Sequence, residues 1–80
     1  MQQIMDKNRI GQNAGILWQV MDNNRDNRVW NMEDLRLASG LNEPDFYAAI
    51  GWLARENKVD FGEDGITHRD TVGLLVEFFH

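Results

Sequence analysis

The side chains best spaced for metal chemistry in this sequence are the oxygen-bearing residues between positions 22 and 33. Their order matches the twelve-residue EF-hand loop, which supplies oxygen ligands from positions 1, 3, 5 and 12 and an aliphatic residue at position 8. A calcium ion takes about six to eight hard oxygen ligands, and this spacing could supply most of them. Calcium binding is therefore one alternative function. The side chains that it assigns to the metal are Asp22, Asn24, Asp26 and Glu33.

Two departures from the calcium pattern favour a simpler interpretation. The loop normally holds Gly at its sixth position, where this chain has Asn27, the next most tolerant residue for a left-handed turn. EF-hands usually occur in pairs, but a second loop beginning at Asp60 fails because its twelfth position is Thr71. The simpler interpretation is a solvated Asn- and Asp-rich loop that leads into a helix.

Catalytic chemistry has weaker support. The run His68-Arg69-Asp70 spells a fragment of the protein kinase catalytic loop, but 80 residues cannot hold the rest of a kinase. Neither His68 nor His80 has an evident nucleophile or metal partner, so we expect both on the surface. We expect no enzymatic activity and no cofactor.

Two adjacent segments carry the start and stop signals of short helices. The first has Asn31 at the N-cap position and Asp34 three residues later, as in a capping box. The second repeats this spacing with Asn42 and Asp45. Gly40 stands between them, where a left-handed residue lets the chain turn sharply. The pattern predicts a helix, a tight turn and a second helix.

A longer amphipathic helix is predicted from residue 8 to about residue 21, because apolar residues recur there with a period of 3.6. A polar loop is expected at residues 22–28. Gly11 and Gly15 each weaken this helix by about 1 kcal/mol relative to Ala, which fits either close packing against another element or a frayed first turn.

The remaining segments predict strands. Val29 and Trp30 fit a short strand, residues 59–61 alternate like another, and residues 62–65 fit a turn. The last segment fits two structures about equally well. As a strand it would align Val72, Leu74, Val76 and Phe78, and as a helix Val72, Leu75, Val76 and Phe79. We favour the strand.

The composition predicts one small domain. A chain of 80 residues with 42% hydrophobic content can bury a modest core, so we expect residues 1–7 as a flexible N-terminus and residues 8–80 as a single domain. The absence of Cys excludes disulfides and a thiolate zinc site, and no signal peptide or membrane span is evident, so we expect a cytoplasmic location. The predicted core is Ile10, Ala14, Leu17, Trp18, Met21, Leu35, Phe46, Ile50, Leu53, Val59 and Phe61.

Three runs point to a known family. They are Ala14-Gly15 with Trp18, Glu33-Asp34-Leu35 with Gly40-Leu41, and FYAAIGWLARENK at residues 46–58. Together they resemble a small bacterial winged helix-turn-helix family of unknown function. The resemblance covers about residues 10–61, and G-W-L-A-R-E is its most specific part. It implies an α+β fold with a three-helix core followed by a β-hairpin wing. It also implies a DNA-binding or transcription-related class without an established ligand.

The predicted second helix of the helix-turn-helix unit suits DNA poorly. A helical wheel puts Phe46, Ile50 and Leu53 on the buried stripe. A DNA reader would insert the opposite face into the major groove, but a net charge of −5 is the wrong sign for a polyphosphate partner. Asp and Pro in its first turn are not common base readers. The opposite face holds Pro44, Asp45, Ala48, Gly51, Trp52, Arg55 and Glu56.

The same face suits a protein partner better. Ala48, Gly51 and Trp52 would form a smooth, partly apolar surface beside Arg55, a composition favoured at protein interfaces. A second copy of the chain is one such partner. Alternatively, Trp52 folds under the hairpin as core. The candidate partner- or DNA-facing residues are Asn42, Ala48, Gly51, Trp52, Arg55 and Lys58.

The sequence therefore predicts a regulatory or adaptor module. DNA binding is expected from the fold class, but the local charge disfavours it. Protein contact or homodimerisation is the interpretation that the surface chemistry favours. No membrane or small-molecule substrate is expected.

Overall fold

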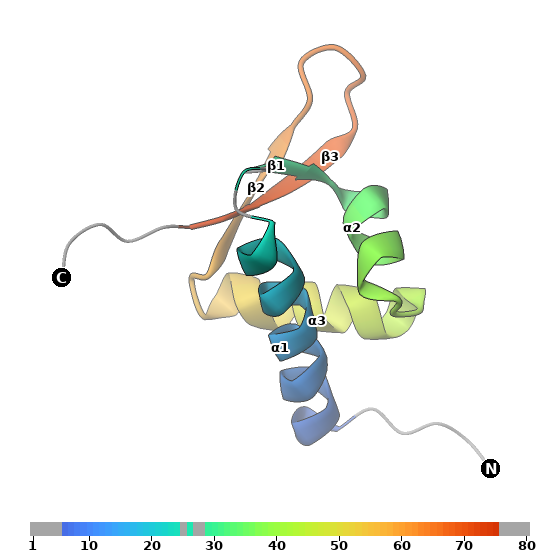
Figure 1. Cartoon of the computed structure of the whole chain (residues 1–80), viewed down its shortest axis with the longest axis vertical. Helices are drawn as coiled ribbons and strands as arrows, with labels where there is room; N and C mark the ends of the chain where they lie inside the picture. Colours follow the sequence, from blue (N-terminus) through green and yellow to red (C-terminus); the bar gives the residue numbers. More distant parts are fainter. Residues whose placement is uncertain (1–5, 25, 27–28, 76–80) are drawn as a thin grey trace, which may run out of the picture.

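A computed structural model describes residues 6–24, 26 and 29–75. Helices and an antiparallel sheet share this part of the chain, which confirms the expected α+β class (Figure 1). The elements are α1 (Lys7–Asn23), β1 (Val29–Asn31), α2 (Met32–Ser39), α3 (Glu43–Arg55), β2 (Val59–Glu63) and β3 (Asp70–Leu74).

Helix α1 is longer than the sequence predicted at both ends. It begins at Lys7 because Asp6 is its N-cap, whose Oδ1 accepts a 2.8 Å hydrogen bond from the backbone N–H of Arg9. Residues 6 and 7 thus belong to the folded unit and not to a flexible tail, while residues 1–5 lie outside the described part. The helix ends at Asn23, so the polar loop starts later than predicted.

The predicted helix, tight turn and helix are confirmed. The Asn31 side chain accepts hydrogen bonds at the start of α2, and Asn42 Oδ1 accepts one from the N–H of Asp45 at 3.0 Å. Gly40 lies between the helices with φ of 77°. The second half of the predicted capping box does not form in α3, because the Asp45 carboxylate binds Arg9 instead.

The conformation of Gly40 gives a direct prediction. A Cβ atom at this position would meet nothing within 4 Å, so the cost of a side chain comes from the backbone conformation alone. Gly40→Val should lower the free energy of unfolding by about 1–2 kcal/mol or more, because a β-branched residue strongly disfavours positive φ. The control is Gly15→Ala in α1, which also has open space and should raise stability by about 1 kcal/mol. Urea denaturation measures both, and equal effects would contradict the prediction.

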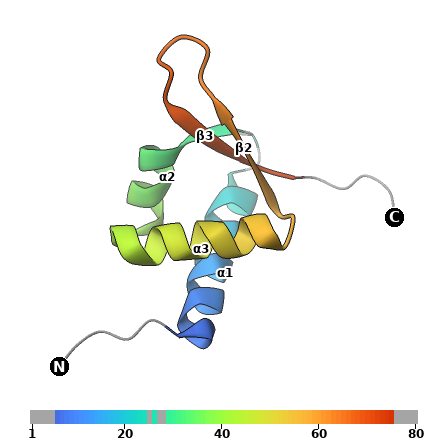
Figure 2. The same ribbon diagram turned by 180° about the vertical axis from the view of Figure 1, so that it is seen from behind.

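The core lies where α1, α2 and α3 meet the sheet. Figure 2 shows α3 lying across α1. Most of the predicted core is confirmed, but Ile10 and Trp18 are only half-buried and Phe61 is exposed. Ala49 and Val72 are buried although they were not in the predicted core. The buried apolar residues are Ala14, Leu17, Met21, Leu35, Phe46, Ala49, Ile50, Leu53, Val59 and Val72.

The sheet has the strand order β1-β3-β2, with antiparallel pairing throughout. Trp30 and Phe61 both pair with Val72, so the three residues form one row on the same face. Val72 at its centre is fully buried. Phe61 lies on β2 at the edge of the sheet, and this position accounts for its exposure, whereas the tip of the hairpin projects away from the helices (Figure 1).

The β2–β3 hairpin corrects two expectations. The last segment is a strand, as favoured, although Val76 and Phe78 lie outside the described residues. The predicted turn at residues 62–65 is wrong, since β2 continues to Glu63. The turn comes later because Asp64 Oδ1 accepts hydrogen bonds from the N–H groups of Ile66 and Thr67, at 2.7 and 2.8 Å.

A left-handed residue also ends α3. Asn57 has φ of 59°, its N–H binds the carbonyl of Ala54, and the next N–H, of Lys58, binds the carbonyl of Leu53 at 2.9 Å. This is the hydrogen-bond pattern of a Schellman motif, with Asn in the position that Gly usually holds. The motif turns the chain from α3 into β2.

Candidate interaction face on the third helix

The outer face of α3 is the part of the predicted site that the structure assembles. Gly51, Trp52 and Arg55 are exposed there, and Ala48 beside them is half-buried. Asn42 and Lys58 are exposed at the two ends of the helix. The structure thus brings Ala48, Gly51, Trp52 and Arg55 together, while Asn42 uses its side-chain oxygen to cap the helix.

Trp52 is not a core residue. Its side chain lies against α1, where a Cβ atom at Gly11 would be 3.7 Å from Cζ2 of the indole ring. The residue as a whole remains 37% exposed. The alternative that Trp52 folds into the core is therefore wrong. Neither glycine of α1 is needed for close packing, since a Cβ at Gly11 would make an ordinary contact with Trp52 and one at Gly15 would meet nothing within 4 Å.

Asp45 does not face outward, contrary to the helical wheel. The residue is 6% exposed, and its carboxylate pairs with the guanidinium of Arg9 on α1. Arg9 Nη2 lies 2.7 Å from Oδ2, and Arg9 Nε donates to Oδ1 at 3.3 Å. This hydrogen bond and the charge of Asp45 raise the pKa of Arg9. The physical reason is that α3 crosses α1, so its buried stripe is wider than the one predicted.

Two residues of the face were not among the predicted site residues. Tyr47 is 52% exposed, and its ring lies edge-on to Phe46 with centroids 5.1 Å apart. Glu43 is exposed in the first turn. Glu43, Tyr47, Gly51 and Arg55 follow one another at intervals of four residues, and this i, i+4 spacing is the sequence signal that could have found the first two. We call Glu43, Tyr47, Gly51 and Arg55 the outer ridge of α3.

Comparison with known families decides the fold. A family model described as "Winged helix-turn-helix domain (DUF2582)" matches residues 5–69, more than half of the chain. The chain belongs to this winged helix-turn-helix family. The resemblance that the sequence suggested is confirmed at this level. Membership supports a regulatory or DNA-binding module as the broad class. No curated protein matches the chain.

The wing of this winged helix is acidic. Exposed Asp60, Glu63, Asp64 and Asp70 outnumber Arg69 on the two strands and the turn of the hairpin. His68 is exposed there as predicted, with Nδ1 3.3 Å from the Glu63 carboxylate, while His80 lies outside the described residues. A wing of this charge repels a phosphate backbone.

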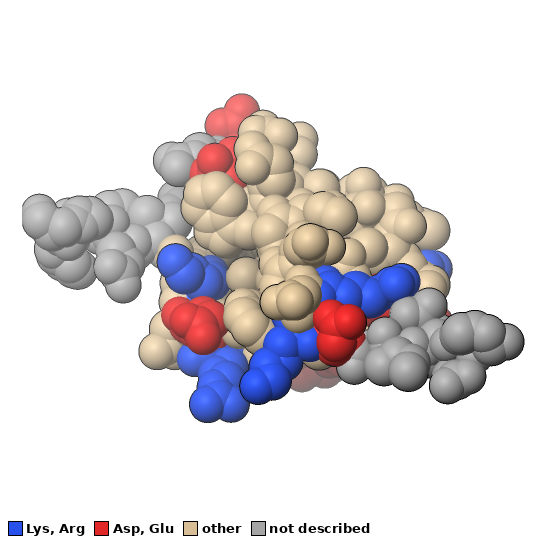
Figure 3. All heavy atoms as spheres, turned by 90° about the horizontal axis from the view of Figure 1, so that it is seen from below, with Lys and Arg blue, Asp and Glu red and all other residues tan. Residues whose placement is uncertain are grey.

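The basic residues of the winged helix gather elsewhere. On the side that faces away from the wing, Lys and Arg side chains gather toward one edge, with Asp and Glu side chains among them (Figure 3). Arg55 and Lys58 form no ion pair with any described residue. These two cations are the contacts on which a DNA-binding α3 would have to rely.

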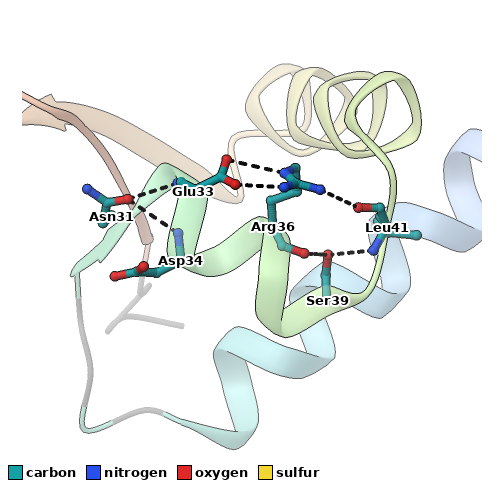
Figure 4. A network of polar contacts seen from close by, with 6 residues as sticks. All are labelled: Asn31, Glu33, Asp34, Arg36, Ser39 and Leu41. Carbon is teal, nitrogen blue, oxygen red and sulfur yellow. Dashed lines mark hydrogen bonds and ion pairs between the residues drawn. The ribbon is translucent and has the colours of Figure 1, made fainter.

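A polar network fixes the turn of the helix-turn-helix unit. Figure 4 shows Arg36 between Glu33 and Leu41. Arg36 Nη2 lies 2.6 Å from Glu33 Oε2, and Arg36 Nη1 donates to the Leu41 carbonyl at 3.3 Å. The Ser39 hydroxyl donates to the Arg36 carbonyl and accepts from the N–H of Leu41. The network joins the start of α2 to the segment that leads into α3.

This network makes the stability of the domain depend on pH. The hydrogen bond from Arg36 lowers the pKa of Glu33 below its ordinary value of 4.5. A carboxyl whose pKa is lower when folded stabilises the fold above its unfolded pKa, and this contribution is lost as the pH falls through the folded pKa. The melting-temperature difference between the wild type and Glu33→Gln should therefore shrink on acidification below pH 4.5.

The matched control is Arg36→Met, which removes the other partner. The difference in melting temperature between Arg36→Met and the wild type should shrink over the same pH range. Thermal unfolding in a series of buffers measures it. If the differences in melting temperature stay constant until Glu33 is fully protonated, the pair of Glu33 and Arg36 does not contribute to the pH dependence of stability.

Calcium binding finds no support. Among the described residues, no group of three or more His, Cys, Asp or Glu side chains is placed to hold a metal ion. Glu33 is held by Arg36, and the Asn24 amide donates to the Val20 carbonyl at 2.7 Å. Asp22 belongs to α1 and not to a loop. No helix in the described stretches is long and apolar enough to cross a membrane.

Proposed function

We propose that this winged helix is a non-catalytic regulatory or adaptor module that binds a protein partner through the outer face of α3. The observation that carries the proposal is the exposure of two aromatic rings, Tyr47 and Trp52, on either side of Gly51. Arg55 stands next to them. Aromatic residues and Arg are the usual anchors of protein interfaces, where a few such side chains supply most of the binding energy.

The chemistry of the face argues against duplex DNA as the main ligand. A recognition helix contacts base edges with its N-terminal residues, and here those exposed residues are Glu43 and Pro44. Asn42, the amide side chain at this end, already uses its oxygen on the N–H of Asp45. Arg55 lies about three turns further along the helix, at the end away from the bases.

The test is site-specific photo-crosslinking of the full chain in its own cells. A photoreactive phenylalanine at Tyr47 should give a discrete protein adduct. The same residue at Leu37, which is exposed on α2, should give none. Adding Trp52→Ala to the Tyr47 probe should reduce the adduct. Equal labelling from both positions, or none from Tyr47, would contradict the proposal.

A gel-shift series tests the DNA alternative. At low salt, where electrostatic binding is strongest, we expect no retardation of a mixed-sequence duplex. Retardation that is lost in Arg55→Ala and Lys58→Ala would assign the face to DNA instead.

A further inference from the structure

The outer ridge of α3 is complementary to itself when it is reversed. It reads Glu43, Tyr47, Gly51 and Arg55, with an acid at one end, a base at the other, and a large ring and a glycine between them. Turned end to end, the acid faces the base and the ring faces the glycine. We propose that the partner at this face is a second copy of the chain, with the two α3 helices packed antiparallel. This proposal rests on the proposed function.

Helix geometry puts Tyr47 and Gly51 near the centre of such a contact and the two charged residues on its flanks. Residues four apart form a continuous ridge, and two such ridges run side by side in the commonest class of helix packing, at a crossing angle of about −50°. Around a twofold axis each contact occurs twice. Glu43 of each copy would therefore meet Arg55 of the other, while Tyr47 would meet Gly51. The two charged positions are about 18 Å apart along the helix.

The charges favour this orientation over the opposite one. Neither Glu43 nor Arg55 forms an ion pair with another described residue, and both are exposed. A parallel pair of α3 helices would bring like charges together at both ends. Ion pairs at the edge of an interface add little affinity but fix orientation and register. The ridge thus selects the antiparallel arrangement.

Gly51 is the second observation that points to a neighbouring helix. A glycine in a helix interior costs about 1 kcal/mol relative to Ala. Nothing in this fold requires one here, because a Cβ at Gly51 would meet no atom within 4 Å. At Gly11 a Cβ would lie 3.7 Å from the Trp52 ring, which is an ordinary contact. A tyrosine ring of a second copy lying over Gly51 would supply the missing reason for the glycine.

Charge exchange gives the sharpest test. By sedimentation velocity, the wild type should be a dimer. Glu43→Arg and Arg55→Glu should each raise the dimer dissociation constant by about tenfold or more, because each places like charges opposite one another at both ends of the helix pair. An equimolar mixture of the two variants should restore the dimer, because each then supplies the charge that the other lacks. Circular dichroism confirms that both variants fold. A monomeric wild type, or a mixture that stays monomeric when each variant is folded, overturns the proposal.

Substitutions at Gly51 test the dimer independently, because they change the size of the side chain and leave its charge unchanged. Gly51→Leu has room in the monomer and should fold, but its side chain occupies the space of the opposing ring, so the dimer should be lost. Gly51→Ala should raise the melting temperature of the dilute protein and weaken the dimer. A Gly51→Leu variant that remains a dimer of unchanged affinity overturns the proposal.

The mass of the Tyr47 crosslink separates this inference from the proposed function. An adduct of twice the 9.3 kDa chain supports the dimer. An adduct to a different protein, together with a monomeric wild type, refutes the dimer and leaves the protein-binding function standing. No adduct of either kind refutes both.

Discussion

Replacing Phe46 with Ala should lower the free energy of unfolding by about 3–5 kcal/mol. Among the residues that the structure describes, Phe46 is the largest fully buried side chain, and it lies on the side of α3 that faces the core. Removing its ring takes away both the transfer free energy and the contacts of the surrounding side chains. The free energy of unfolding of a small domain is about 5–15 kcal/mol in total, so the variant should lose a large share of its stability.

Urea denaturation followed by circular dichroism measures the effect. The control is Leu37→Ala on α2, an exposed apolar residue whose truncation should change stability by about 0.5 kcal/mol or less. A loss for Phe46→Ala as small as that of the control would mean that the core is not centred on α3.

Arg9→Ala should destabilise the domain more than removal of both members of the Arg9–Asp45 pair. The Asp45 side chain is almost fully buried, so losing Arg9 leaves a carboxylate shielded from water without its partner. The double variant Arg9→Met, Asp45→Leu removes the charge as well and should recover part or all of the loss. The side chain of Arg9 is 40% exposed, so solvent screening moderates the effect.

Thermal unfolding of the three proteins checks the order of stability. Lys7→Met is the matched control, because Lys7 is an exposed cation in the same turn of α1 without an ion pair to a described residue. It should leave the melting temperature nearly unchanged. The double variant could instead prove less stable than Arg9→Ala. The pair would then stabilise the fold by more than the neutralisation of the buried Asp45 charge.

Local signals in the sequence were enough to predict the helix-turn-helix unit. The caps at Asn31 and Asn42 and the positive φ of Gly40 depend on residues within four positions of each other. The ends of the strands and the burial of their residues do not depend on neighbouring residues alone. Phe61 alternates correctly for a strand, but its exposure depends on the place of β2 at the edge of the sheet, which the strand order sets.

The candidate face shows the same limit. The wheel correctly placed Gly51 and Arg55 outward, because their positions follow from helical periodicity. It misplaced Asp45, because the width of the buried stripe depends on how α3 crosses α1. The position of Trp52 could not be predicted either, since it depends on Gly11, some forty residues earlier in the chain.

The strand order has a consequence for the order in which the elements fold. Strand β3 lies between β1 and β2 but follows both in the chain, so neither can form its backbone hydrogen bonds in the sheet until residues 70–74 have been made. The contacts of α1 with α2 and α3 need no such late segment. Folding can therefore begin with the contacts between the helices, and the sheet closes as the last step, because β1 and β3 are separated by about forty residues in the chain.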